Sequence, residues 1–386
     1  MLKKYLLAPG PTPVPPEVLL AMAAPVVLHR TPAFSELFRK VSDKCAQLFG
    51  TRQSVLTLSS SGTGAMEAAV TNTLSPGDRV VVVSGGKFGE RWAEISRAYG
   101  LEVIEIAVEW GSAVDPQQVA DELRAHPETR AVMVQHSETS TTAVHPVEDI
   151  AAITRNTETL LIVDGITSVG VIDAPMDATG IDVLVTGSQK ALMLPPGLAL
   201  IALSEKAWRA SAKAKLPRYY FDLAKAKKSL EDNTSAYTPA VSMIFGLDAV
   251  FRLVEAEGGW PAVYRRHRIL AAAARRGVTA MGLELLAPSA PSPATTGIRV
   301  PGGIDGGTLV KYVRDVIGVT IAGGQGKLKG KILRLAHIGY ADTFDVVVGL
   351  AAMEMGLRHF GRDVPLGRGP GAAQEVLLQL YQEACQ

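Results

Sequence analysis

The stretch D-V-L-V-T-G-S-Q-K-A-L, residues 182–192, joins the pattern of a buried strand to a lysine that such a strand does not require. Residues 182–186 are mostly apolar, as is typical of a strand covered by helices on both faces. Lys190 follows behind Gly187, Ser188 and Gln189 and precedes a second apolar segment. Because lysines are mostly solvated, an ordinary surface loop is one interpretation. A functional lysine at the edge of a sheet is the other, and the rest of the chain favours it.

Further runs of the same kind predict a large sheet around this stretch. They cover residues 54–58, 79–83, 102–106, 131–135, 159–163 and 198–203. Several are apolar throughout, as expected where helices cover both faces of a mostly parallel sheet. Alanine-rich amphipathic segments fit between them as helices, at residues 64–74, 89–99, 116–125 and 147–155. The sequence therefore predicts an α/β fold with a mostly parallel, seven-stranded sheet.

The chain is expected to contain an arm and two domains, because 386 residues exceed the usual size of a single core. Residues 1–16 form the arm, which is too rich in proline for a helix and should run extended. A large domain is predicted for residues 17–258. A long helix at 264–277 leads into a smaller C-terminal α+β domain, residues 259–386, with strands at 297–300 and 332–336 and helices at 307–317 and 343–358.

Charge and cysteine content narrow the class of function. The chain has 39 basic and 38 acidic residues, so its formal charge of +1 gives no reason to expect a nucleic acid or an anionic membrane as partner. Cys45 and Cys385 are too far apart in sequence for a disulfide framework or a metal site, which indicates a reducing compartment. Neither a signal peptide nor a membrane span is predicted. We expect a cytoplasmic protein that acts on small molecules without a metal.

The segment S-S-S-G-T-G-A-M-E-A-A-V, residues 59–70, follows a predicted strand and opens a predicted helix. Small residues and the free N–H groups of a helix start favour a bound phosphate. The segment is not a dinucleotide fingerprint, because Glu67 stands where the third glycine belongs, and no P-loop lysine follows. Taken alone, an ordinary capped helix start explains the segment equally well.

Asp164 ends the strand T-L-L-I-V-D, at the edge where open α/β sheets bind ligands, although a turn-capping aspartate is the alternative. Lys190 follows the next strand and falls at the corresponding edge. A lysine, an aspartate and a phosphate-binding helix start on one rim suit pyridoxal 5'-phosphate. The lysine forms a Schiff base with the aldehyde, the carboxylate keeps the ring nitrogen protonated, and the helix start anchors the phosphate.

Seven motifs in order carry a resemblance to a known family. The chain resembles the class V aminotransferases of pyridoxal-phosphate fold type I, and within them the alanine–glyoxylate and serine–pyruvate aminotransferase group. The resemblance covers roughly residues 6–358. The motifs are L-A-P-G-P-T-P-V-P, S-G-T-G-A-M-E-A-A, S-G-G-K-F-G-E-R, H-S-E-T-S-T, V-D-G-I-T-S-V-G, G-S-Q-K-A-L-M-L-P-P-G and G-K-I-L-R-L-A-H-I-G.

The resemblance implies a role for each matched residue. Lys190 would carry the cofactor, and Asp164 would pair with the ring nitrogen. The phosphate would be held by Ser61, Gly62, Thr63 and the side chain of Gln189. The two faces of the ring would be covered by Phe88 and Ile166, and Thr139 would hydrogen-bond near the ring hydroxyl and the substrate.

Arg334, in K-I-L-R-L, has a physical case of its own as a substrate-binding residue. A guanidinium inside an apolar strand is costly unless it is paired, and the α-carboxylate of a substrate offers bidentate pairing. A structural salt bridge is the alternative.

The resemblance also implies a homodimer with shared active sites. Thr238, with Tyr237, would reach the partner's phosphate from the segment T-S-A-Y-T-P. Ser235 stands where some relatives have an aromatic residue, and Thr142 stands where many have glycine.

The implied reaction is a ping-pong transfer, through the Lys190 Schiff base, of the amino group of alanine or serine to glyoxylate or pyruvate. Two alternatives remain: another donor, such as aspartate or an aminophosphonate, or a non-enzymatic accessory subunit on the same scaffold. A desulfurase would need a reactive cysteine near the ring, and neither Cys45 nor Cys385 is placed for that role. A nicotinamide-dependent dehydrogenase lacks its glycine fingerprint here.

Overall fold

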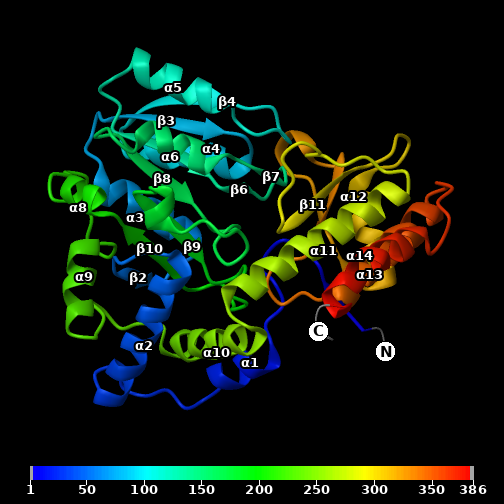
Figure 1. The fold of residues 1–386 in the computed structure, drawn as a ribbon, viewed down its shortest axis with the longest axis horizontal. Helices are drawn as coiled ribbons and strands as arrows, with labels where there is room; N and C mark the ends of the chain where they lie inside the picture. Colours follow the sequence, from blue (N-terminus) through cyan, green and yellow to red (C-terminus); the bar gives the residue numbers. More distant parts are fainter. Residues whose placement is uncertain (1–2, 383–386) are drawn as a thin grey trace.

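The computed structural model describes residues 3–382 of the chain. Cys385 and the outermost residues of the expected arm and C-terminal domain lie outside this range. Figure 1 shows a large sheet with helices on both sides and, beyond helix α11 (Trp260–Ala280), a smaller assembly of short strands and helices. Within the described range, no helix is long and apolar enough to cross a membrane.

The large sheet contains the seven expected strands, each within one residue of its predicted bounds. They are β2 (Val55–Leu58), β3 (Arg79–Ser84), β4 (Glu102–Ala107), β5 (Ala131–Gln135), β8 (Leu160–Asp164), β9 (Val183–Gly187) and β10 (Ala199–Leu203). Their spatial order is β2-β10-β9-β8-β5-β3-β4. β10 runs antiparallel to both of its neighbours, β2 and β9, and the other strands of this sheet share one direction, so the prediction of a mostly parallel sheet is confirmed.

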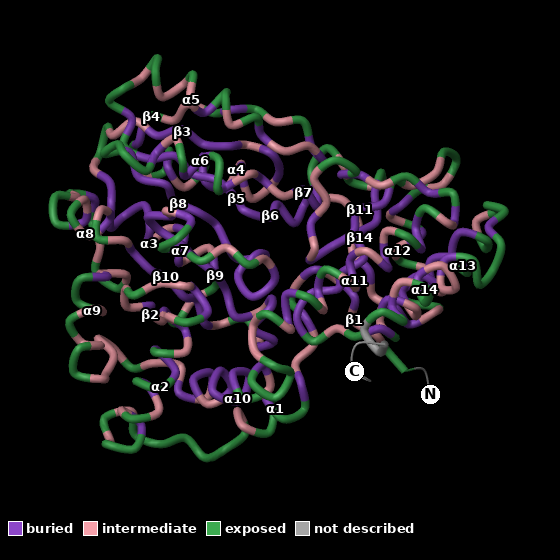
Figure 2. Tube along the Cα trace, viewed as in Figure 1, coloured by how far each residue is buried: buried purple, intermediate pink, exposed green. Residues whose placement is uncertain are grey.

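Helices cover both faces of this sheet, and side chains of each strand alternate between two cores. Val81 and Val83 of β3 point into one core, while Val80 and Val82 point into the other. The first core is covered by α2 (Pro32–Phe49), α5 (Pro116–Ala125), α6 (Val147–Thr154) and α10 (Val241–Glu257). The second is covered by α3 (Gly62–Thr73), α4 (Lys87–Ala98), α8 (Glu205–Ser211) and α9 (Leu223–Glu231). Figure 2 shows the strands buried between them.

The smaller assembly is built on a three-stranded sheet with the order β11-β14-β13. Its elements are β11 (Thr295–Arg299), β13 (Ala322–Gly323), β14 (Ile332–Ala336), α12 (Gly306–Tyr312), α13 (Thr343–His359) and α14 (Arg368–Gln382). The predicted helix at 307–317 changes to a π-helical turn at Val313–Ile317. Gly258 and Gly259, with φ of 108° and 83°, separate α10 from α11 at the predicted domain boundary. The division into domains itself stays a prediction.

The expected N-terminal arm is extended and continues the smaller assembly. Its strand β1 (Tyr5–Leu6) pairs in parallel with β12 (Val319–Thr320). Leu7 is 3% exposed and packs in the core of the smaller assembly. The remaining elements are short: helices α1 (Pro16–Met22) and α7 (Met176–Thr179), the hairpin β6 (Ser137–Glu138) and β7 (Ala143–Val144), and the 3-10 turn Gly326–Leu328.

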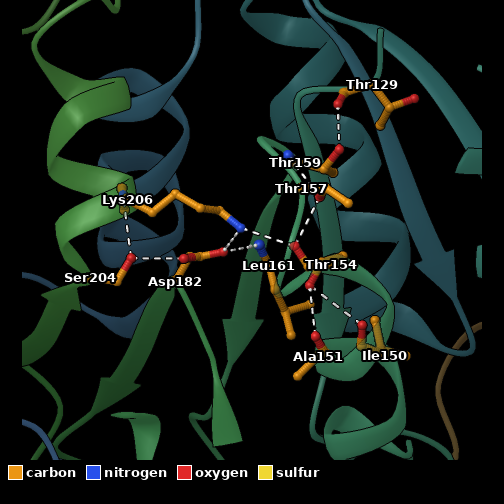
Figure 3. A network of polar contacts seen from close by, with 11 residues as sticks. Thr129, Ile150, Ala151, Thr154, Thr157, Thr159, Leu161, Asp182, Ser204 and Lys206 are labelled. Atoms are coloured by element: carbon orange, nitrogen blue, oxygen red, sulfur yellow. Dashed lines mark hydrogen bonds and ion pairs between the residues drawn. The ribbon is translucent and has the colours of Figure 1, made fainter. Parts of the chain in front are cut away.

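A buried polar network ties the beginning of β9 to its surroundings (Figure 3). Asp182 accepts hydrogen bonds from the Leu161 N–H at 2.9 Å and the Ser204 hydroxyl at 2.8 Å, and its carboxylate pairs with Lys206 Nζ at 2.8 Å. Lys206 also donates to the carbonyl of Thr154 at 3.2 Å. The network therefore links β8, β9, α6 and α8 at the edge of the sheet opposite Lys190.

We predict that Asp182→Ala destabilises the protein by about 3 kcal/mol, because removing one partner of a buried ion pair leaves the other charge uncompensated. The midpoint of urea unfolding measures the effect. As a control, Asp43→Ala removes an exposed ion pair with Arg39 and should cost less than about 1 kcal/mol. Equal effects of the two substitutions would contradict the stabilising role of the network.

Candidate active site

A cavity of about 270 Å³ lies at the carboxyl ends of the parallel strands β5, β8 and β9. It brings together most of the residues predicted for the cofactor. Those lining it are Ser61, Gly62, Thr63, Phe88, Thr139, Asp164, Ile166, Gln189 and Lys190. Their predicted contacts with a cofactor stay predictions, but the sequence correctly gathers these distant segments at one site.

The loop after β9 explains why Lys190 points into this cavity. The Ser188 N–H donates to the Leu198 carbonyl at 2.8 Å, and the Ser188 hydroxyl donates to the Pro195 carbonyl at 2.6 Å. The same hydroxyl accepts from the Leu198 N–H at 3.2 Å. These bonds fold the loop back on itself, and Lys190 is only 8% exposed. The surface-loop interpretation of this lysine is therefore wrong.

Lys190 is held in a state that loses its proton readily. Burial, and to a lesser extent the positive charge of Arg334, lower the pKa of Lys190 to about 8, while Asp164 and Glu138 act in the opposite direction. Nζ donates a hydrogen bond to the carbonyl oxygen of Pro9 in the arm. An amine with this pKa is substantially neutral near pH 8, which a nucleophile or a proton acceptor requires.

Asp164 lies at the end of β8 and is 4% exposed. Burial, and to a lesser extent the negative charge of Glu138, raise its pKa to about 7. The Ile166 N–H, which donates to Asp164 Oδ1 at 2.8 Å, acts in the opposite direction, as do the cations Lys190 and Arg91. A carboxyl group with this pKa would be held ionised by a cationic ring nitrogen placed beside it.

The start of the 12-residue helix α3 faces the same cavity. Ser61 is its N-cap residue, and its hydroxyl makes no capping hydrogen bond within the described helix. Gly62 is required by packing, because a Cβ there would lie 2.8 Å from Ile166 Cγ1. Gln189 Oε1 is buried and has no hydrogen-bond partner in the described part of the chain. A helix start and a glutamine amide whose N–H groups can donate to phosphate oxygens fit a phosphate-bearing cofactor.

Glu138, which the sequence reasoning missed, fixes the aromatic wall of the cavity. Its Oε2 accepts the N–H groups of Phe88 and Gly89, each at 3.0 Å. Its Oε1 accepts the N–H and the hydroxyl of Ser140 at 3.0 and 2.6 Å. Burial raises the pKa of Glu138, while these four donors oppose the rise. The carboxylate thus joins the start of α4, with Phe88, to the segment that carries Thr139.

Arg334 is tied to the cavity wall although it does not line the cavity. It is 5% exposed, and it donates from Nη1 to the Thr139 carbonyl at 2.9 Å and from Nε to the Gly323 carbonyl at 3.0 Å. The Thr139 hydroxyl pairs with that of Thr167 at 2.5 Å. Within residues 3–382, no carboxylate forms a salt bridge with Arg334, so the structural salt bridge that was the alternative is not formed there.

Tyr237 and Thr238 are not brought into this cavity. With Ser235 they line a separate small cavity beside β2. The Tyr237 ring stacks on Tyr220 with centroids 5.3 Å apart, and its hydroxyl donates to the Tyr219 carbonyl at 3.1 Å. Their predicted reach into a partner's site stays a prediction.

Ser235 and Thr142, which differ from the residues expected at these positions in relatives, each have a local structural consequence. The Ser235 hydroxyl donates to the Tyr237 carbonyl at 2.6 Å. Thr142 has φ of 57°, a left-handed conformation that glycine adopts more readily.

Arg91 is a second site residue that sequence reasoning missed. It lines the cavity, donates from Nη1 to the Thr63 hydroxyl at 3.1 Å, and places its guanidinium 4.8 Å from the centre of the Phe88 ring. Arg91 follows Phe88 by three residues on a helix, and this spacing places both side chains on one face. This spacing in the sequence was the signal that could have identified Arg91 as a site residue.

Comparisons with known proteins agree with the geometry. The family model described as aminotransferase class-V matches residues 4–331. A soluble hydrogenase 42 kDa subunit from Anabaena cylindrica is 40% identical, over 97% of this chain and 98% of that protein. The L-aspartate–glyoxylate aminotransferase of Paracoccus denitrificans is 37% identical, over 95% and 94%. The crystal structure of pyridoxamine–pyruvate aminotransferase from Mesorhizobium loti superimposes with a TM-score of 0.92 at 33% identity, covering 98% of each chain.

The lowered pKa of Lys190 predicts how the cofactor-free protein captures pyridoxal phosphate. Only the neutral amine attacks an aldehyde, so the capture rate should rise with pH and level off above about 8. Stopped-flow absorbance measures the rate, and borohydride reduction followed by peptide mass spectrometry shows whether Lys190 is the residue modified. A midpoint near about 10.4, the ordinary value for a lysine, would contradict the prediction.

Proposed function

The chain belongs to the aminotransferase class-V family and is a pyridoxal-phosphate-dependent aminotransferase, and from that premise we propose its substrates and its residue roles. We propose that it moves the amino group of a small amino acid, alanine or serine, to a small 2-oxo acid, glyoxylate or pyruvate, in a ping-pong cycle. We place this activity in the cytoplasm. The observation that carries the proposal is the pairing, in one cavity, of a lysine with a lowered pKa and a carboxylate with a raised pKa.

Pyridoxal phosphate, when bound, supplies an aldehyde that reacts with amines and a ring that accepts electrons. Asp164 would hold the ring nitrogen, and the start of α3 with Gln189 would hold the phosphate. Phe88 and Ile166 would enclose the ring and keep water away from it. The place of Ser61 and Gln189 on the wall of the same cavity, beside the start of α3, supports this orientation.

Lys190 would move the proton in both halves of the reaction. Its neutral amine would take a proton from the α-carbon of the amino donor, hold it on Nζ and then give it to a different atom of the reacting system. Arg334 would bind the substrate carboxylate and so orient the α-carbon towards Nζ. The donor and the acceptor would both be bound through Arg334 and so would use the same carboxylate position in turn, which is the physical basis of the proposed ping-pong order.

The size of the cavity favours small substrates. About 270 Å³ is slightly below the usual range of ligand sites, roughly 300–1,000 Å³, and the cofactor and substrate must share it. Arg91, which lines the cavity, donates from Nη1 to Thr63 and lies over the Phe88 ring, which leaves it less available for a second carboxylate. This arrangement favours alanine or serine over aspartate as the donor.

The relative named as a hydrogenase subunit bears on the accessory-subunit alternative. Against that alternative, the cavity of this chain contains both Lys190 and Asp164.

We propose that the enzyme works as a homodimer in which Tyr237 and Thr238 reach the partner's phosphate. Two observations support this: Thr238 is exposed and lies outside the chain's own cavity, and large apolar side chains are exposed near α1. They are Leu19, Leu20, Val26, Val27 and Leu28. Apolar clusters of this kind are typical of protein interfaces.

A half-reaction screen tests the proposed function. The purified enzyme is mixed with single amino acids, and the conversion of the bound aldehyde to its amine form is followed by absorbance. We expect alanine or serine to react fastest, and then glyoxylate or pyruvate to reverse the change. Lys190→Ala should abolish turnover. Turnover by Lys190→Ala would refute the mechanism, and a faster reaction with aspartate would refute the proposed donor.

We predict that Arg334→Lys lowers kcat/KM by about 10- to 100-fold, because lysine keeps the charge but loses the bidentate fork. The loss should appear mainly in KM for both substrates, which steady-state kinetics measures. Arg299→Lys on the neighbouring strand β11 is the matched control, since Arg299 is exposed and should change neither constant. An unchanged KM in Arg334→Lys would contradict the binding role.

A further inference from the structure

The N-terminal arm makes a direct contact with the lysine of the active site. Lys190 Nζ donates its hydrogen bond to the carbonyl oxygen of Pro9, a buried residue of the arm. The next residue, Gly10, has φ of 146°, a backbone conformation that favours glycine. A Cβ at Gly10 would meet Nζ itself and would lie 2.7 Å from Lys190 Cε. The backbone of the arm at Gly10 therefore lies so close to Nζ that it leaves no room for a side chain.

The arm is fixed on both sides of this contact. On one side, Thr12 donates from its N–H to the Gln189 carbonyl at 3.1 Å and from its hydroxyl to the Lys190 carbonyl at 3.0 Å. On the other side, Leu7 accepts from the Ala336 N–H at 3.0 Å. Ala336 is two residues beyond Arg334 on β14. The short segment from Leu7 to Thr12 thus connects the strand of Arg334 to the loop of Lys190.

We propose that the Pro9 carbonyl is the acceptor that positions the free amine of Lys190 during turnover, and that Gly10 makes this position possible. The inference rests on the proposed role of Lys190 as the group that moves the proton. Pro9 and Gly10 act through Lys190, so they are positioning residues.

The chemistry of a carbonyl acceptor suits this task. A neutral amine has two N–H groups and one lone pair, and a carbonyl oxygen can only accept a hydrogen bond. Donation of one N–H to Pro9 fixes the direction of that bond and restricts where the lone pair can point. Because the carbonyl does not take up a proton in this pH range and carries no net charge, it raises the basicity of the amine only weakly. A carboxylate in the same place would instead favour the ammonium form, which cannot accept a proton.

Gly10→Ala tests the proposal, because the added methyl group takes the space of the Nζ–Pro9 contact. We expect the variant still to capture pyridoxal phosphate on Lys190, as shown by borohydride reduction and peptide mass spectrometry. The half-reaction with the donor should slow by about 10- to 100-fold, as expected when a reacting group is misplaced. The rate ratio between α-protonated and α-deuterated donor should increase, because proton transfer becomes the slow step.

A second measurement separates lost positioning from simple loosening of the site. The pKa of Lys190 in the cofactor-free, full-length protein is read from the pH dependence of its acetylation by acetic anhydride, quantified by mass spectrometry. Loss of the Pro9 acceptor should lower this pKa below the wild-type value, since a hydrogen bond to the carbonyl favours the charged form. Loosening alone would admit water and move the pKa upward, towards the ordinary value.

Two further variants complete the test. Gly77→Ala substitutes another glycine of positive φ, 80°, that has no atom within 4 Å of its added Cβ, and it should react like the wild type. Thr12→Val removes the arm's hydroxyl bond to the Lys190 carbonyl without adding an atom beside Nζ, and it should slow the half-reaction in the same direction but less. It carries the test if Gly10→Ala does not fold.

The proposal is overturned if Gly10→Ala, or Thr12→Val in its place, reacts at the wild-type rate, or if the pKa of Lys190 rises in the variant. These outcomes differ from a failure of the proposed function. In that case Lys190→Ala itself would keep turnover, whatever the behaviour of the arm variants.

Discussion

The site depends on removing Lys190 and Asp164 from water at the same edge of one sheet. Burial disfavours the charged form of each, and it brings their pKa values to about 8 and about 7. Two groups with nearly matched proton affinities can exchange their charge states with small changes in their surroundings. A rigid frame is needed to keep both groups buried. The turn fixed by Ser188 and the packed strands β8 and β9 provide that frame.

Backbone groups solvate the charges of the site, and few side-chain counter-ions do so. Arg334 is held by the carbonyls of Thr139 and Gly323, Lys190 by the carbonyl of Pro9, and Glu138 largely by backbone N–H groups. Peptide dipoles satisfy hydrogen bonds without cancelling the net charge. The guanidinium of Arg334 therefore keeps a full positive charge for a carboxylate ligand. This is the electrostatic preorganisation that enzyme sites exploit, because the dipoles are already oriented before the substrate binds.

The sequence predicted the strands, Lys190 and Asp164 because each is marked by a local pattern, a short apolar run followed by a polar residue at its carboxyl end. Contacts between remote segments leave no such pattern. Glu138 binds the N–H groups of residues 88 and 89, and Pro9 binds a lysine 181 positions away. The resemblance named most of the residues that line the cavity, but not those that hold them in place. Tyr237 and Thr238 are a different case, since their predicted role depends on a second chain.

The two charged residues at the ends of strand β9, Asp182 and Lys190, differ in role because they differ in their partners. Asp182 at its start and Lys190 beyond its end are both largely buried. Asp182 is neutralised by Lys206 at 2.8 Å and has two further donors, so its hydrogen-bonding capacity is largely used within the fold. Lys190 and Asp164 face one cavity but form no ion pair with each other in the described part of the chain. A direct pair would stabilise both charged forms and move their pKa values apart, which would remove the neutral amine that proton transfer needs. In the proposed mechanism, the separation of Lys190 from Asp164 is therefore as necessary as their proximity.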